Sequence, residues 1–235
     1  MKFNKMFFFV ILSIIAQRLI INIYLPESNI FSFLNGIPFG TNFKYLNTYM
    51  LSWIIFILST LSYFSGNLTK LLNGYGKLLI IRNYSKTKLI LCEISKLYLM
   101  LFLLIIIQFF VFWNPNISFY SNDMYSILLM SLLYFFTVII LILIQFFLEL
   151  FISAEISTIC IYIYTVFSVI FYNIIYINNP NLNLFYYILI PNLAMSYRNG
   201  LIDNNFNLVN LIVLILYQFL LILFSIIKIR KTELF

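Results

Sequence analysis

Residues 124–148 read MYSILLMSLLYFFTVIILILIQFFL, a run of 25 residues without a charged side chain. An α-helix rises about 1.5 Å per residue, and about 20 apolar residues are enough to cross the hydrocarbon core of a bilayer. The rest of the chain has the same character, because 63% of its 235 residues are hydrophobic and only 9% are charged. A soluble domain carries roughly 25% charged residues. This composition therefore excludes a soluble enzyme, a nucleic-acid-binding domain and a disordered chain.

Five further apolar runs are long enough to cross a membrane as helices. We therefore predict an all-α, polytopic membrane protein with one transmembrane domain over residues 1–235. The predicted spans are approximately residues 6–25, 46–64, 89–112, 124–148, 157–177 and 208–227.

The positions of Lys and Arg predict the orientation of these spans. Basic residues lie before the first span, between the second and third, and after the sixth, whereas the opposite side has only Lys44 and Arg198. Short cytoplasmic loops carry the excess of Lys and Arg, so both termini are expected in the cytoplasm. The net charge of +7 is then a topological signal of a multi-pass protein, and we expect no nucleic acid as a partner.

Several kinds of chemistry are absent from the sequence. The chain has no histidine, which removes the usual general base and His-based metal sites. Cys92 and Cys160 lie in apolar surroundings and are expected to be buried free thiols. No phosphate-binding loop of the form Gly-x-x-x-x-Gly-Lys-Ser/Thr is present. We therefore assign no catalytic residue, no metal site and no bound cofactor, and any ATP-driven function needs a nucleotide site on another polypeptide.

The segment before the last span is apolar but interrupted. Residues 184–197 contain Pro191, which makes a clean span unfavourable. We predict a re-entrant or interfacial segment here, with Tyr186, Tyr187 and Tyr197 at the depth of the lipid headgroups.

Two neighbouring polar residues lie inside the first span. Gln17 and Arg18 are far enough from its ends to be costly in hydrocarbon, and such residues are functional candidates by default. They could line a path for an acidic or amphipathic substrate. Alternatively, Arg18 could extend its side chain to the interface or form an ion pair.

Other polar residues within the spans are expected to hold helices together. Glu93 and Lys96 are three residues apart on one helix face and should neutralise each other. Gln108, Gln145 and Gln218 are expected to form hydrogen bonds between helices, a contribution that averages about 0.6 kcal/mol.

Two connections on the predicted cytoplasmic side are candidate contact surfaces. Residues 65–88 contain five basic residues and no acidic one. This loop either docks into a groove on a partner protein or rests on anionic membrane lipid. In the short second connection, Glu149 and Glu155 are either a second docking contact or two solvated carboxylates at helix ends.

The stretch from Gly74 to Lys96 resembles the corresponding loop of six-span ABC exporter permeases. In that family a glycine is followed by a short hydrophobic run, a basic or turn residue, a Ser-Arg or Ser-Lys pair, and a Lys near the start of the next span. The chain as a whole looks like the compact permeases encoded beside an ABC ATPase in Gram-positive peptide-export and bacteriocin self-protection operons. The matching positions are Gly76, Leu78, Leu79, Arg82, Ser85, Lys86 and Lys96.

This resemblance implies a permease subunit that exports or extracts a hydrophobic or amphipathic peptide across the cell membrane. Its expected partners are two copies of an ABC ATPase, which bind ATP and magnesium, and a second permease copy or a paralogue. Glu149 and Glu155 would form a second cytoplasmic contact with the ATPase. The alternatives are a substrate-binding membrane subunit of a vitamin importer, a non-transporting immunity protein and an intramembrane enzyme. The implied ATPase-coupling loop contains Gly74, Tyr75, Gly76, Lys77, Arg82, Ser85, Lys86 and Lys88.

Overall fold

The protein is all-helical in the part that the structure describes. The structure is a computed structural model, and the residues it describes are 5–24, 31–38, 43–74, 76, 85–113, 121–178, 184–199 and 208–231. Within these ranges no strand occurs, and six helices are long and apolar enough to cross a membrane. The predicted all-α class with six spans is therefore confirmed.

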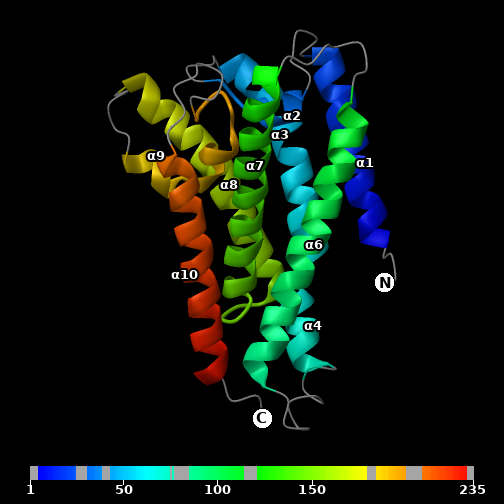
Figure 1. Cartoon of the computed structure of the whole chain (residues 1–235), viewed down its shortest axis with the longest axis vertical. Coiled ribbons are helices and arrows are strands. Elements are labelled where there is room, and N and C mark those ends of the chain that lie inside the picture. The colour runs from blue at the N-terminus through cyan, green and yellow to red at the C-terminus, as the bar shows by residue number, and fades with distance from the viewer. Residues whose placement is uncertain are drawn as a thin grey trace.

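The six long helices lie side by side in an elongated bundle (Figure 1). Most of them extend the predicted apolar runs by a few residues, because polar ends continue the helix beyond the hydrocarbon-sized segment. The largest difference is in the second span, where the apolar stretch continues to Leu72 through a turn and a short extra helix. The six helices are α1 (Lys5–Tyr24), α3 (Phe43–Phe64), α6 (Lys86–Phe112), α7 (Ser121–Leu148), α8 (Ala154–Asn178) and α10 (Val209–Lys231).

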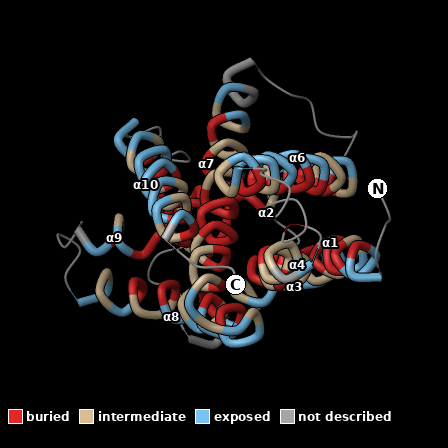
Figure 2. The backbone as a smooth tube through the Cα atoms, turned by 90° about the horizontal axis from the view of Figure 1, so that it is seen from below, coloured by how far each residue is buried: buried red, intermediate tan, exposed pale blue. Residues whose placement is uncertain are grey.

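Helix α7 is the centre of the bundle. It contacts α3, α6, α8 and α10, and Figure 2 shows its buried backbone surrounded by the other helices. In contrast, α10 lies at the edge and exposes most of its apolar side chains. The exposed apolar faces are those expected to meet lipid tails, because lipid is as apolar as leucine and gives helices no hydrophobic reason to hide such residues.

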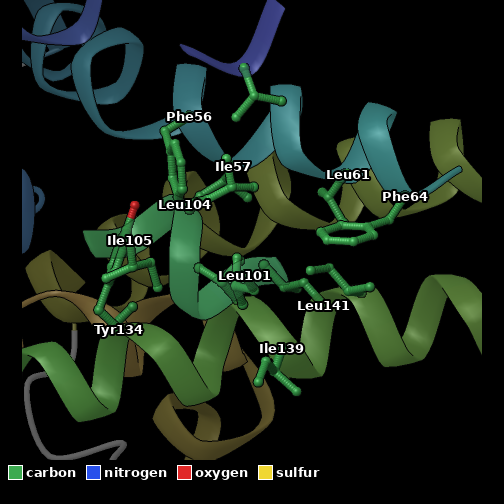
Figure 3. Packing of buried hydrophobic residues seen from close by; sticks show 14 of the residues in the cluster. Phe56, Ile57, Leu61, Phe64, Leu101, Leu104, Ile105, Tyr134, Ile139 and Leu141 are labelled. Carbon is green, nitrogen blue, oxygen red and sulfur yellow. The ribbon is translucent and has the colours of Figure 1, made fainter. Parts of the chain in front are cut away.

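The core lies where α3, α6 and α7 meet (Figure 3). The side chains there are large and closely packed, and Tyr134 of α7 stacks on Phe56 of α3 with ring centroids 6.1 Å apart. Packing of this kind holds membrane helices together through dispersion contacts. The buried residues shown in this region are Phe56, Ile57, Leu61, Phe64, Leu101, Leu104, Ile105, Tyr134, Ile139 and Leu141.

The segment before the last span folds back against the bundle. It contains α9 (Leu184–Ile188) and the 3-10 helix η1 (Ile190–Ala194), and η1 is buried against α7 and α8. Tyr186 is buried within the bundle, with its ring 5.4 Å from that of Tyr172, and the headgroup depth predicted for it stays a prediction.

The segment that contains η1 is also joined to the short helix α2 (Ser32–Asn35) near the other end of the sequence. The Ser196 amide donates to the Leu34 carbonyl at 3.0 Å, and the Tyr197 amide donates to the Asn35 carbonyl at 3.1 Å. This link lies at one end of the bundle, opposite the end that carries the short helix after α3 (Figure 1).

The two cysteines correct a prediction. Cys92 on α6 and Cys160 on α8 are free, as expected, but both are exposed rather than buried. An apolar neighbourhood in the sequence does not indicate burial in this protein, because the surface that faces lipid is itself apolar.

Candidate functional site

The candidate site is the short helix α4 (Asn67–Asn73) and the residues around it, at the end of the bundle away from α2 and η1 (Figure 1). This helix has two different faces. Leu68 is fully buried and Leu71 is half-buried, whereas Lys70 is exposed. The helix is therefore anchored in the bundle by one side and presents a basic residue on the other.

Glu149, just after α7, binds the N-terminus of α4. Its Oε1 atom accepts a hydrogen bond of 2.8 Å from the backbone amide of Gly66, the residue that begins α4 with a φ of +73°. The backbone amides of Leu68 and Thr69, in the first turn, interact with the same carboxylate. A helix N-terminus has unpaired amides and a partial positive charge, so a carboxylate is a suitable cap.

The side chain of Glu149 is only 6% exposed. Burial raises the pKa of its carboxyl group above the usual value, and this effect outweighs the amide hydrogen bonds, which lower it. The interpretation of Glu149 as a solvated carboxylate is therefore wrong, because its side chain is buried and accepts a hydrogen bond within the chain. Glu155 differs, since it lies exposed in the first turn of α8.

Side-chain hydrogen bonds extend this connection to α8. The Ser65 and Thr158 hydroxyls are 2.7 Å apart, and Gln145 Nε2 donates to Thr158 Oγ1 at 3.0 Å. The hydroxyl of Tyr162 donates to the Leu58 carbonyl at 3.0 Å. The turn between α3 and α4 is thus fixed to both α7 and α8.

The two glycines of the predicted coupling loop lie directly on the C-terminal end of α4. The Gly74 amide donates to the Lys70 carbonyl at 3.0 Å. A Cβ atom at Gly74 would be 2.7 Å from that oxygen, and a Cβ at Gly76 would be 2.4 Å from the Leu71 carbonyl oxygen. The close approach therefore requires glycine at both positions, which gives a physical reason for this part of the motif.

The remaining residues of the predicted loop are placed only in part. Ser85 is the N-cap of α6 and has an extended backbone, but its side chain makes no capping hydrogen bond. In the first turn of α6, Lys86 is half-buried and Lys88 is exposed. Tyr75, Lys77 and Arg82 lie outside the described residues.

Gln17 and Arg18, the predicted substrate path, have different surroundings. Gln17 is fully buried, and its Oε1 accepts a hydrogen bond of 2.7 Å from Nε2 of Gln108 on α6. Arg18 is half-buried on the neighbouring face of α1. Gln17 thus joins two helices, and the path itself stays a prediction.

The other polar contacts predicted within and between the spans are confirmed. Gln145 donates to the Leu61 carbonyl at 3.2 Å in addition to Thr158. Gln218 accepts a hydrogen bond of 2.9 Å from the hydroxyl of Tyr98, which links α10 to α6. The Glu93 and Lys96 side chains form the expected ion pair, at 2.5 Å.

A buried arginine was missed by the sequence analysis, which counted Arg198 only as a basic residue of an outer loop. Its side chain is 4% exposed and donates to the Ile37 carbonyl at 2.8 Å, to the Val169 carbonyl at 3.4 Å, and to Asn192 Oδ1. Burial lowers the pKa of its guanidinium to about 10, so the group remains charged at neutral pH. Arg198 therefore fastens the segment after η1 to the α2 region and to α8. In the sequence, the only indication of the burial of Arg198 was its position eight residues after an apolar run.

The described residues offer no obvious site for a metal ion, since no three Cys, Asp or Glu side chains gather there. The candidate site is instead a possible contact surface for another molecule. A short amphipathic helix, exposed on one side, is connected by a buried carboxylate to helices distant in sequence.

Comparison with known proteins identifies the family. A protein of Bacillus subtilis (strain 168) described as "Uncharacterized protein YybK" is similar over 243 aligned residues, with 27% identity, 97% of this chain covered and 96% of that protein covered. No solved structure matches the chain. The family model described as "Protein of unknown function (DUF2705)" matches residues 10–235. Because this match covers nearly the whole bundle, the chain belongs to that family.

Proposed function

We propose that the protein is the transmembrane subunit of an ABC transporter that exports or extracts a hydrophobic or amphipathic peptide, and that a separate ATPase subunit supplies the energy. In this proposal, α4 and the residues that follow it form the surface that the ATPase contacts. The observation that carries the proposal is the bond between Glu149 and Gly66, because it connects this partly exposed helix to a spanning helix far away in the sequence.

The connections of α4 suit a role in transmitting force. A push on its exposed face, which carries Lys70, would move the buried anchor Leu68. The displacement would reach α3 through the chain itself, α7 through Glu149, and α8 through Thr158. Contiguous packing and hydrogen bonds are the physical means by which a displacement at one site reaches another.

The resemblance described above supplies the remaining parts of the proposal. The subunit would work with a second copy or a paralogue, together with two ATPase subunits that bind ATP and magnesium, in the cell membrane of a Gram-positive bacterium. Glu155, which is exposed near the same end of the bundle, is the remaining candidate for a second contact. A hydrophobic or amphipathic peptide is the preferred substrate because the spans lack the charge needed for hydrophilic solutes, and because the resemblance implies it.

The experiment co-expresses the chain with a candidate ABC ATPase subunit and measures two things: co-purification of the two proteins and ATP hydrolysis in vesicles. Replacement of Arg82, Ser85 and Lys86 together by Ala should abolish both association and coupled hydrolysis. The matched control is Lys228→Ala, which removes a basic residue on α10 that lies over the ring of Phe151. This control should retain both properties.

Three outcomes would refute the proposal. The triple variant could associate and couple normally, in which case the coupling assignment is wrong. The isolated chain could bind a vitamin tightly without any ATPase, which would indicate the capture subunit of an importer. The chain could also protect cells against a bacteriocin when the ATPase gene is deleted, which would indicate a non-transporting immunity protein.

A further inference from the structure

A groove of about 570 Å³ lies between the α3–α4 segment and α6, at the end of the bundle that carries α4. Its lining combines charged and polar side chains, among them Lys70 and Lys96, with apolar ones such as Phe64 and Leu99. Lys70 and Leu99 are exposed, so the groove opens to the surroundings of the protein.

The two walls of the groove change from polar to apolar in the same direction. Along the first wall, the exposed Lys70 on α4 is followed, toward the bundle centre, by Phe64 on α3. Along the second wall, Lys96 is followed by Met100, about 6 Å further along α6 at about 1.5 Å per residue. Because α3 and α6 run in opposite directions, both polar ends lie at the end of the bundle and both apolar ends lie toward its middle. This order matches the boundary between lipid headgroups and acyl chains.

The charge in the groove favours an anion. Lys96 is paired with Glu93, so these two groups nearly cancel. Lys70 forms no ion pair with any side chain that the structure describes, and its charge is therefore uncompensated there. Basic groups at the cytoplasmic surface of a membrane attract anionic lipids.

We propose that this groove binds one anionic phospholipid, with its headgroup phosphate against Lys70, beside the Glu93–Lys96 pair, and an acyl chain along the apolar wall. A surface that merely follows the positive-inside rule would attract many lipids weakly. A groove whose two walls both change from polar to apolar at the same depth would hold one lipid in a defined position. This site is independent of the proposed transport function, because it needs neither an ATPase nor a substrate.

The test measures lipid binding by the full chain, purified in detergent and stripped of lipid. Phosphatidylglycerol and phosphatidylcholine are titrated separately, and the bound lipid is counted by native mass spectrometry. The wild-type chain should retain one phosphatidylglycerol and discriminate against phosphatidylcholine. Lys70→Gln should weaken phosphatidylglycerol binding about fivefold, since each basic residue near an anionic surface contributes about 1 kcal/mol. The control Lys228→Gln, outside the groove, should bind as the wild type does.

A second pair of variants tests occupancy of the groove without changing its charge. Ser95 lines the groove, whereas Cys92 is exposed on the same helix and does not line it. Ser95→Trp should fill the groove and lower lipid retention several-fold, and Cys92→Trp should not.

Equal retention of the two lipids would overturn the proposal, as would an equal loss in Lys70→Gln and Lys228→Gln or in both Trp variants. Displacement of the lipid by inorganic phosphate alone would also overturn it, because the site would then recognise phosphate rather than a lipid. None of these readouts involves an ATPase, so a failure here is distinct from a failure of the transport proposal.

Discussion

Replacing Glu149 by Ala removes the carboxylate that caps α4 and leaves the buried Gly66 amide without its acceptor. A hydrogen bond to a charged group contributes about 1.5–3 kcal/mol, and an N-cap side chain contributes about 1 kcal/mol. These two values describe the same interaction in part, so they are not added. We expect a loss of about 2 kcal/mol in the local stability of α4, within the range of the two values. At that value, the open state of α4 becomes about 30 times more populated.

Hydrogen–deuterium exchange of the full chain, followed by mass spectrometry, measures this change directly. Backbone amides from Gly66 to Asn73 should exchange about 30 times faster in Glu149→Ala, whereas amides in the middle of α6 should not change. Glu155→Ala is the matched control, because Glu155 is an exposed carboxylate close in sequence. Unchanged exchange in Glu149→Ala, or equal acceleration by both variants, would refute the capping assignment.

The pKa of Glu149 predicts the direction in which the stability of the protein changes with pH. Its pKa in the folded protein is raised, so between the ordinary value of 4.5 and the folded value the folded state binds more protons than the unfolded state. The free energy of unfolding therefore falls as the pH rises through this interval. Glu149→Gln keeps an acceptor oxygen but cannot titrate. The midpoint of thermal unfolding of this variant should therefore not fall with pH in this interval, and the variant should lose less stability than Glu149→Ala. Identical pH profiles for wild type and Glu149→Gln would contradict the prediction.

Further substitutions test other parts of the bundle. Gln17→Leu should lower the free energy of unfolding in detergent by about 1–3 kcal/mol, because it leaves the Gln108 amide buried and unpaired, and the double variant with Gln108→Leu should cost less than the single one. Gly36→Ala should lower it by about 2 kcal/mol, because φ at Gly36 is +71° and the new Cβ would lie 2.4 Å from Met195 Cγ; Met195→Ala in the same chain should recover part of the loss. In a chain whose two native cysteines are replaced by Ser, Glu155→Cys should react with a membrane-impermeant maleimide only after the cells are permeabilised; labelling in intact cells would contradict the predicted topology.

The six spans could be predicted from the sequence because they depend on a local property. A run such as residues 124–148 identifies itself by its length and lack of charge. The prediction of buried cysteines failed for a related reason. In a soluble protein an apolar neighbourhood indicates the interior, but here the surface is apolar as well, and Cys92 and Cys160 lie on it.

The Glu149–Gly66 bond could not be predicted because it joins residues 83 positions apart. Locally, Glu149 is only a carboxylate after an apolar run, and such residues usually lie in water. The burial of Arg198 was hidden in the same way, since its acceptors Ile37, Val169 and Asn192 come from three separate segments. Polar residues that are costly to bury have partners that only the tertiary structure reveals.

In the proposed transporter, the link between α2 and the segment after η1 restricts where a passage can form. Arg198 and the backbone hydrogen bonds of Ser196 and Tyr197 hold the two segments of one subunit together at the end of the bundle away from α4. In the proposed transporter, a substrate that leaves at this end would pass between two subunits rather than through one, along the outward faces of these helices.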